Sequence, residues 1–172
     1  MIHRNLAESN LQFVNAELVA AFNTPADQLT QQQKDLLAQS ISLISELNDA
    51  DVYVFGVPMY NFSVPALFKA YIDLVVRAGK TFSYEGGRPN GLLKNKKLYV
   101  VVASGGDYRA EPMKSLDFLE PYVRTILGFI GIADITFIRA YGHDAETVSA
   151  TTQAAKDSID AVFQTVGASA HQ

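Results

Sequence analysis

Short apolar segments alternate with amphipathic helical segments along this chain, and this alternation constrains the fold more than any other feature of the sequence. Three segments are mostly β-branched, aromatic and uncharged, as expected of buried strands: residues 51–57, 97–103 and 135–139. Helical patterns follow them in turn, over residues 65–78, 115–129 and 144–166. Strands that alternate with helices predict an α/β domain in which a parallel sheet carries helices on both faces.

The region before the first predicted strand is expected to be mostly helical. A short helix is predicted over residues 15–22. Thr30 has the pattern of a helix N-cap, and Gln33 lies three residues later, where it completes a capping box. An apolar stripe at helical spacing then runs as far as Leu47. Two further segments are candidates for short extended pieces, at residues 1–3 and 81–84.

Two loops follow neighbouring predicted strands and carry the residues best suited to bind a ligand. In open α/β sheets, ligands bind at the carboxyl ends of the strands, which lie side by side at one edge. The first loop is bounded by prolines and offers the flat or polarizable residues Pro58, Met59, Tyr60, Asn61 and Phe62. The second contains a Gly-Gly pair, which lets backbone approach a ligand closely; its residues are Ala103, Ser104, Gly105, Gly106 and Tyr108. The alternative is that both are ordinary turns whose aromatic rings cover the core.

Composition narrows the classes of function. The 172 residues suffice for one domain with a continuous core, expected to span residues 1–172. A net charge of −4 disfavours a nucleic-acid or anionic-membrane surface. Cysteine is absent, and the histidines have no metal-ligand spacing, so neither disulfides nor a metal site is expected. No apolar run is long enough for a membrane span, and residues 1–5 lack a signal core, so a cytoplasmic location is expected.

Several segments, taken in order, resemble a single known family, the FMN-dependent NADH:quinone and azo oxidoreductases, which have a flavodoxin-like fold. The resemblance covers nearly all of the chain from about Leu6 onward. The matching segments are Pro-Met-Tyr-Asn-Phe at 58–62, Ala-Leu-Phe-Lys-Ala-Tyr-Ile-Asp at 66–73, Arg-Ala-Gly-Lys-Thr-Phe at 77–82, Gly-Leu at 91–92, Lys-Lys at 96–97, Gly-Gly-x-Tyr at 105–108 and Leu-Gly-Phe-Ile-Gly-Ile at 127–132.

The resemblance implies a flavin site built from the two loops. Residues 58–62 would wrap the isoalloxazine ring of FMN, and residues 103–108 would approach it with backbone N–H groups. NADH or NADPH would pass a hydride to the flavin, and a quinone or azo compound would then be reduced in the same space by ping-pong kinetics. Tyr84 and Phe129 match aromatic residues of the acceptor pocket, which the partner subunit of a homodimer helps to form; core or interface packing is the alternative for both.

The resemblance begins just after the point at which the family's second strand ends. Family members usually start with a strand, a serine-rich loop that binds the FMN phosphate, and a helix. The expected fold is therefore a flavodoxin-like three-layer sandwich with a parallel sheet, truncated at its N-terminus, and FMN is expected to be held weakly. Either the chain starts upstream of Met1 or it is a shortened paralogue. A shortened paralogue would be a non-catalytic module for dimerisation or interaction, which is the second functional hypothesis.

Overall fold

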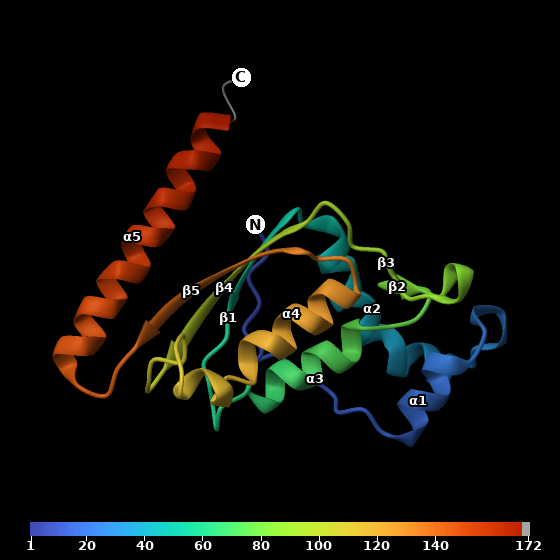
Figure 1. The fold of residues 1–172 in the computed structure, drawn as a ribbon. Helices are drawn as coiled ribbons and strands as arrows, with labels where there is room; N and C mark the ends of the chain where they lie inside the picture. Colours follow the sequence, from blue (N-terminus) through green and yellow to red (C-terminus); the bar gives the residue numbers. More distant parts are fainter. Residues whose placement is uncertain (170–172) are drawn as a thin grey trace. The chain divides into compact units, whose positions relative to one another are not determined.

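The computed structural model describes residues 1–169, apart from the side chains of residues 86 and 165–169 (Figure 1). The helices of this region are α1 (Ala16–Asn23), α2 (Gln31–Asp49), α3 (Ala66–Val75), α4 (Leu119–Phe129) and α5 (Ala145–Ser169). The strands are β1 (Val52–Gly56), β2 (Phe82–Ser83), β3 (Asn90–Gly91), β4 (Lys97–Ser104) and β5 (Asp134–Tyr141). Three short 3-10 turns complete the set, η1 (Ala26–Gln28), η2 (Glu85–Gly87) and η3 (Met113–Leu116).

The three long strands form one sheet, in which β4 lies between β1 and β5. The strands β1 and β4 run parallel. The amide of Val57 donates to the carbonyl of Val101 at 2.9 Å, and two residues further along both strands the amide of Met59 donates to the carbonyl of Ala103 at 2.8 Å. Alternate side chains of β4 are completely buried, namely Leu98, Val100 and Val102. The predicted α/β order with a parallel sheet is therefore confirmed.

Most predicted elements lie within a few residues of their expected positions, and the differences have local causes. The extended piece predicted at 81–84 is present as β2, which pairs with β3 in an antiparallel ladder. The strand considered for residues 1–3 was wrong, because these residues have no regular structure. The helix predicted from residue 115 begins only at Leu119, because the preceding residues form η3 and the Asp117 side chain caps the helix.

One face of β1 is exposed, contrary to the prediction of a strand buried on both faces. Tyr53 is buried, whereas the alternate residues Val52 and Val54 are 54% and 68% exposed. Among the described residues β1 is also an edge strand of the three-stranded sheet. An apolar run distinguishes a strand from a loop, but it does not show how many faces are covered.

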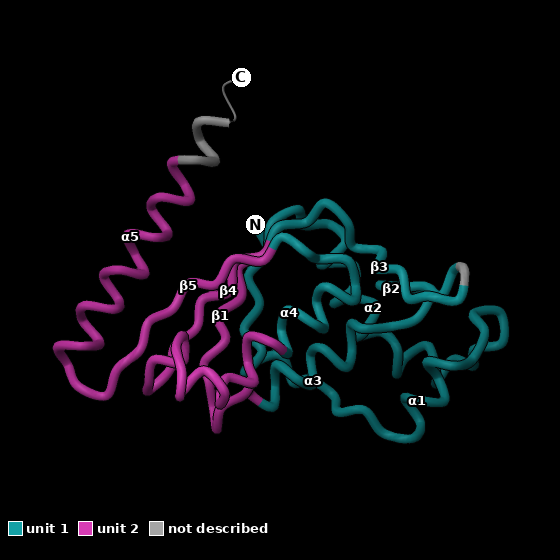
Figure 2. Tube along the Cα trace, in the orientation of Figure 1, with its two compact units in different colours: residues 1–53, 66–97, 122–134 teal, residues 54–65, 98–121, 135–172 magenta. Residues whose placement is uncertain are grey.

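The chain divides into two compact units, coloured separately in Figure 2. Unit 1 comprises Met1–Tyr53, Ala66–Lys97 and Tyr122–Asp134. Within it, the capping box predicted at the start of α2 is present: the amide of Gln33 donates to the Thr30 hydroxyl at 3.2 Å, and the Gln33 side chain accepts from the Thr30 amide at 3.0 Å. The buried Ser40 hydroxyl of α2 donates to the carbonyl of Leu74 in α3 at 2.6 Å. The Ser40–Leu74 bond joins α2 to α3.

Unit 2 comprises Val54–Pro65, Leu98–Pro121 and Ile135–Gln172. It holds most of the residues of the three long strands, the loops that follow them and α5. Within residues 1–169, no helix combines the length and the apolar character that a membrane crossing requires. That the whole of residues 1–172 forms one domain stays a prediction, and residues 170–172 lie outside the described region.

Candidate active site

The loop after β1 contains a tight two-residue turn with an unusual backbone. The amide of Tyr60 donates to the carbonyl of Ser63 at 3.0 Å, and the amide of Ser63 donates back to the carbonyl of Tyr60 at 3.1 Å. Both central residues have positive φ, 49° at Asn61 and 68° at Phe62. Asparagine tolerates this region, but a phenylalanine there is rare. Such a residue carries strain of about 1–3 kcal/mol, and strained residues cluster at functional sites.

The side chains of this turn face solvent although they are large and apolar. Tyr60 is 62% exposed and Phe62 is 41% exposed. A turn that only covered the core would bury these rings, so the exposure disfavours the alternative of an ordinary capping turn. Flat, exposed rings on a rigid backbone are suited to contact another flat molecule.

The loop after β4 meets this turn, as expected for neighbouring parallel strands. The Met59–Ala103 hydrogen bond joins the starts of the two loops at 2.8 Å. Further on, the rings of Phe62 and Tyr108 meet edge to face, with centroids 6.1 Å apart and planes inclined at 77°. The Ser104 hydroxyl donates to the carbonyl of Gly106 at 2.8 Å, which closes the Gly-Gly segment on itself. The structure therefore brings together the two sets of residues that the sequence singled out.

His143 is a neighbour of this site that sequence reasoning missed. A Cβ placed on Gly105 would lie 2.5 Å from Cε1 of His143, so the imidazole ring packs directly against the glycine backbone. His143 follows Gly142, whose amide donates to the carbonyl of Ser104 at 3.1 Å. The signal in the sequence was its position just beyond the third predicted strand, at the same edge as the two loops.

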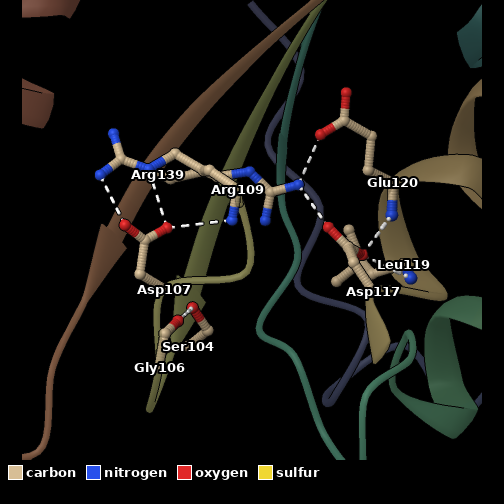
Figure 3. Close-up of polar contacts among 8 residues, drawn as sticks. All are labelled: Ser104, Gly106, Asp107, Arg109, Asp117, Leu119, Glu120 and Arg139. Atoms are coloured by element: carbon tan, nitrogen blue, oxygen red, sulfur yellow. Dashed lines mark hydrogen bonds and ion pairs between the residues drawn. The ribbon is translucent and has the colours of Figure 1, made fainter. Parts of the chain in front are cut away.

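A charged link connects the loop after β4 to the end of β5. The Asp107 carboxylate accepts from Nε and Nη2 of Arg109 at 2.8 and 2.7 Å (Figure 3). The same Nη2 donates to the Tyr141 hydroxyl at 2.6 Å, and the guanidinium lies 4.9 Å from the centre of the Tyr141 ring. The Arg109 hydrogen bond holds the pKa of Asp107 well below its ordinary value. The pKa of Arg109 is raised by the same bond.

A second, buried charged cluster holds the start of α4. One oxygen of Asp117 accepts from the amides of Leu119 and Glu120, both at 2.9 Å, which caps the helix. Its other oxygen accepts from Nη2 of Arg139 at 2.8 Å, and Nη2 also donates to Glu120 at 2.5 Å (Figure 3). Only 9% of the Arg139 side chain is exposed. Its Nη1 is buried and has no hydrogen-bond partner among the described residues.

Tyr84 and Phe129, predicted for the acceptor pocket, belong to unit 1. Both rings contact Phe82, with centroid distances of 5.5 Å for Tyr84 and 4.6 Å for Phe129. Tyr84 is 64% exposed, so packing of the core does not account for its ring. The structure thus groups these two aromatic residues around a third, and their role in a pocket stays a prediction.

The parallel sheet with its helices, and the two loops at the ends of β1 and β4, define a flavodoxin-like α/β protein. A family model described as having a flavodoxin-like fold matches residues 1–163. The FMN-dependent NADH:quinone oxidoreductase of Herminiimonas arsenicoxydans is 46% identical over 142 residues, which are 83% of this chain and 70% of that protein. A relative of the same name from Paraburkholderia phymatum is 41% identical over 94% of this chain and 81% of its own length. The chain belongs to the family of FMN-dependent NADH:quinone oxidoreductases.

The match does not extend over the full length of these relatives. FMN-dependent NADH:quinone oxidoreductase 1 of Hahella chejuensis is 54% identical over 76% of this chain but only 62% of its own length. Among solved structures, an azoreductase from Bacillus anthracis strain Sterne is 28% identical and superposes with a TM-score of 0.80 over 90% of this chain and 78% of its own. An FMN-dependent NADH-azoreductase from the Ames Ancestor strain, solved in complex with FMN, has a TM-score of 0.80 at 24% identity over 92% of this chain and 79% of its own, and shows the fold alone.

Proposed function

We propose that this chain is an FMN-dependent oxidoreductase that reduces quinones or azo compounds with NADH, or with NADPH. The observation that carries the proposal is the meeting of two loops at the ends of β1 and β4, with exposed rings at Tyr60 and Phe62. Relatives whose matched segments include these regions are named FMN-dependent NADH:quinone oxidoreductases.

The residues at this edge fit a flavin ring. The ring is flat and largely apolar on its faces and carries polar atoms on one edge, so it needs aromatic cover and a few fixed hydrogen-bond donors. Phe62 and Tyr108 offer the cover. The left-handed backbone of Asn61 and the glycines of the segment 105–106 are suited to bring backbone amides close to a ligand. We assign the ring contacts to Pro58, Met59, Tyr60, Asn61, Phe62, Ala103, Ser104, Gly105, Gly106 and Tyr108.

When bound, FMN supplies the redox chemistry by accepting a hydride from the nicotinamide and returning two electrons to the acceptor, which predicts ping-pong kinetics. The protein's own part is to orient and to exclude water. The turn holds the backbone that carries Phe62 before any ligand arrives, so less ordering is needed on binding. We propose that Tyr84 and Phe129 border the acceptor, in a homodimer. No side chain has to act as a general acid or base in this scheme.

The test is a visible spectrum of the purified chain, first titrated with FMN and then separated from the excess. We expect the titration to show weak FMN binding, part of the flavin absorption to migrate with the protein, and NADH to bleach that flavin without oxygen. Addition of menadione should restore the absorption. The exposed Phe163, 68% exposed on α5, provides a control, since Phe163→Ala should change none of these readings. A folded chain that shows no FMN binding in the titration would contradict the proposal.

A second candidate function, a non-catalytic dimerisation or interaction module, is favoured by one observation. The exposed face of β1 presents Val52 and Val54, at 54% and 68% exposure, on an edge strand. Apolar side chains on an edge strand promote association with another chain. Sedimentation of the flavin-free chain separates the two functions. A stable oligomer that binds no FMN favours the module, whereas a flavin-loaded species that reacts with NADH favours the enzyme.

A further inference from the structure

Phe118 is an exposed aromatic residue on an unusually well-held stretch of backbone in unit 2. The residue is 57% exposed, although it lies between two buried residues, Asp117 at 8% and Leu119 at 0%. It stands between η3 and α4, where two other apolar side chains, Met113 and Leu116, are each 37% exposed. Isolated exposed apolar residues are common, but an apolar group on a rigid segment often marks a binding surface.

The backbone of Phe118 is fixed from two directions. Its amide donates to the carbonyl of Phe62 at 3.0 Å, which ties it to the strained turn of the proposed flavin site. On its N-terminal side, Asp117 caps α4 and also accepts from Arg139, which bonds Glu120 as well (Figure 3). Arg139 is therefore placed to hold the residues before and after Phe118, although it does not contact the turn in any bond described above.

Exposed aromatic residues that contribute strongly to binding are often held by a rigid backbone. A flat side chain with two torsions loses little conformational entropy when a ligand contacts it, and locked neighbours reduce that loss further. The ligand best suited to an exposed ring on backbone bonded to Phe62 is itself flat and aromatic, because aromatic pairs add attraction beyond the area that they bury. The hydrogen bond from its amide to Phe62 ties its backbone to the turn of the proposed flavin site.

We propose that Phe118 contacts the planar quinone or azo acceptor, and that Arg139 is a positioning residue that acts through Asp117 and Glu120. This inference rests on the proposed oxidoreductase function. It adds to that function a residue that contacts the planar acceptor.

The first experiment is steady-state kinetics of Phe118→Ala with menadione as the quinone and methyl red as the azo compound. We expect KM for the acceptor to rise about 3- to 10-fold, in line with the loss of one aromatic contact. The FMN dissociation constant should stay within twofold of the parent chain. Phe118→Tyr should restore KM, and Phe163→Ala should leave it unchanged. An unchanged acceptor KM in Phe118→Ala would overturn the proposal.

The second experiment does not depend on catalysis. In the chain labelled with ¹³C-phenylalanine, the ring signal of Phe118, assigned by its loss in Phe118→Leu, should shift when menadione is added. Arg139→Lys should weaken this shift while α-helical content stays the same. If FMN does not bind but the Phe118 signal shifts, the proposed function fails and the aromatic-binding role of Phe118 stands. If FMN binds and NADH bleaches it but the signal does not move, the role of Phe118 is refuted alone.

Discussion

Gly105 is the residue at which the backbone of the candidate site is least able to carry a side chain. A Cβ there would lie 2.5 Å from Cε1 of His143, but this atom is the far end of an exposed side chain that can rotate away. We therefore expect Gly105→Ala to change the free energy of unfolding by about 0.5 kcal/mol or less. The FMN dissociation constant should rise by about tenfold, because the flavin ring would meet the new methyl group.

The double variant Gly105→Ala, His143→Ala separates the two possible reasons for a glycine. If Gly105 serves close approach of the flavin, removal of the imidazole leaves the weakened binding unchanged. If Gly105 serves only to accommodate His143, the double variant regains the parent affinity, and the assignment of Gly105 to flavin contact is wrong. Fluorescence quenching of FMN on binding gives the dissociation constants, and His143→Ala alone is the matched control.

The residues of the candidate site show which information was local in the sequence. Apolar runs and proline or glycine boundaries predicted both loops, because strand ends and turns depend on nearby residues. The positive φ of Phe62 was not predictable, since phenylalanine disfavours it and only tertiary contacts enforce it. The same holds for the contacts of Arg109 with Tyr141, of Arg139 with Asp117 and of His143 with Gly105, because these partners are remote in sequence.

At the scale of elements, the Asp107–Arg109–Tyr141 link should preorganise the loop after β4. All three groups are partly exposed, so the interaction is expected to contribute at most about 1 kcal/mol. Arg109→Ala removes the ion pair and the contact with the Tyr141 ring, and should weaken FMN binding by up to about fivefold. Tyr141→Phe removes only the hydroxyl and should have a smaller effect. An equal loss in both variants would show that the ion pair contributes nothing.

The contribution of the Asp107–Arg109–Tyr141 link to FMN binding should not depend on pH in the neutral range. The pKa of Asp107 is lowered in the folded chain, chiefly by the hydrogen bond from Arg109. A carboxylate of lowered pKa contributes stability that is present above its unfolded pKa and is lost only as the pH falls through the folded value. The ratio of FMN dissociation constants between Arg109→Ala and the parent chain should thus be the same at pH 6 and pH 8.

The observed ends of helices and strands agreed with the predicted ones where the sequence contained a recognisable cap, and differed where a tertiary contact set the end. The capping box of Thr30 and Gln33 set the start of α2 as predicted. The start of α4 was placed too early, since nothing local marked Asp117 as the cap in preference to Ser115. Whether β1 was covered on one face or two depended on the rest of the sheet, which an apolar run does not encode.

At the scale of the whole molecule, buried tyrosines set an upper pH limit on stability. Burial raises the pKa of Tyr53 to about 12, and it raises the pKa of Tyr71 still more strongly. Tyr53 is 5% exposed and donates to the carbonyl of Leu47 at 2.5 Å, and Tyr71 is 8% exposed. A group whose pKa is raised on folding stabilises fully below its unfolded pKa, near 10 for tyrosine, and loses that contribution as the pH rises toward the folded value.

The free energy of unfolding should therefore stay nearly constant from pH 7 to 9 with respect to these groups and fall above about pH 10. Each buried tyrosine adds up to about 1.4 kcal/mol per pH unit to that slope, because the unfolded chain releases a proton that the folded chain retains.

Urea titrations of the parent chain and of Tyr71→Phe at pH 8, 10 and 11 measure the effect. The variant should lose less stability between pH 8 and 11, whatever its stability at pH 8. Equal slopes in Tyr71→Phe and the parent chain would mean that Tyr71 ionises as readily in the folded as in the unfolded state, which its burial does not allow.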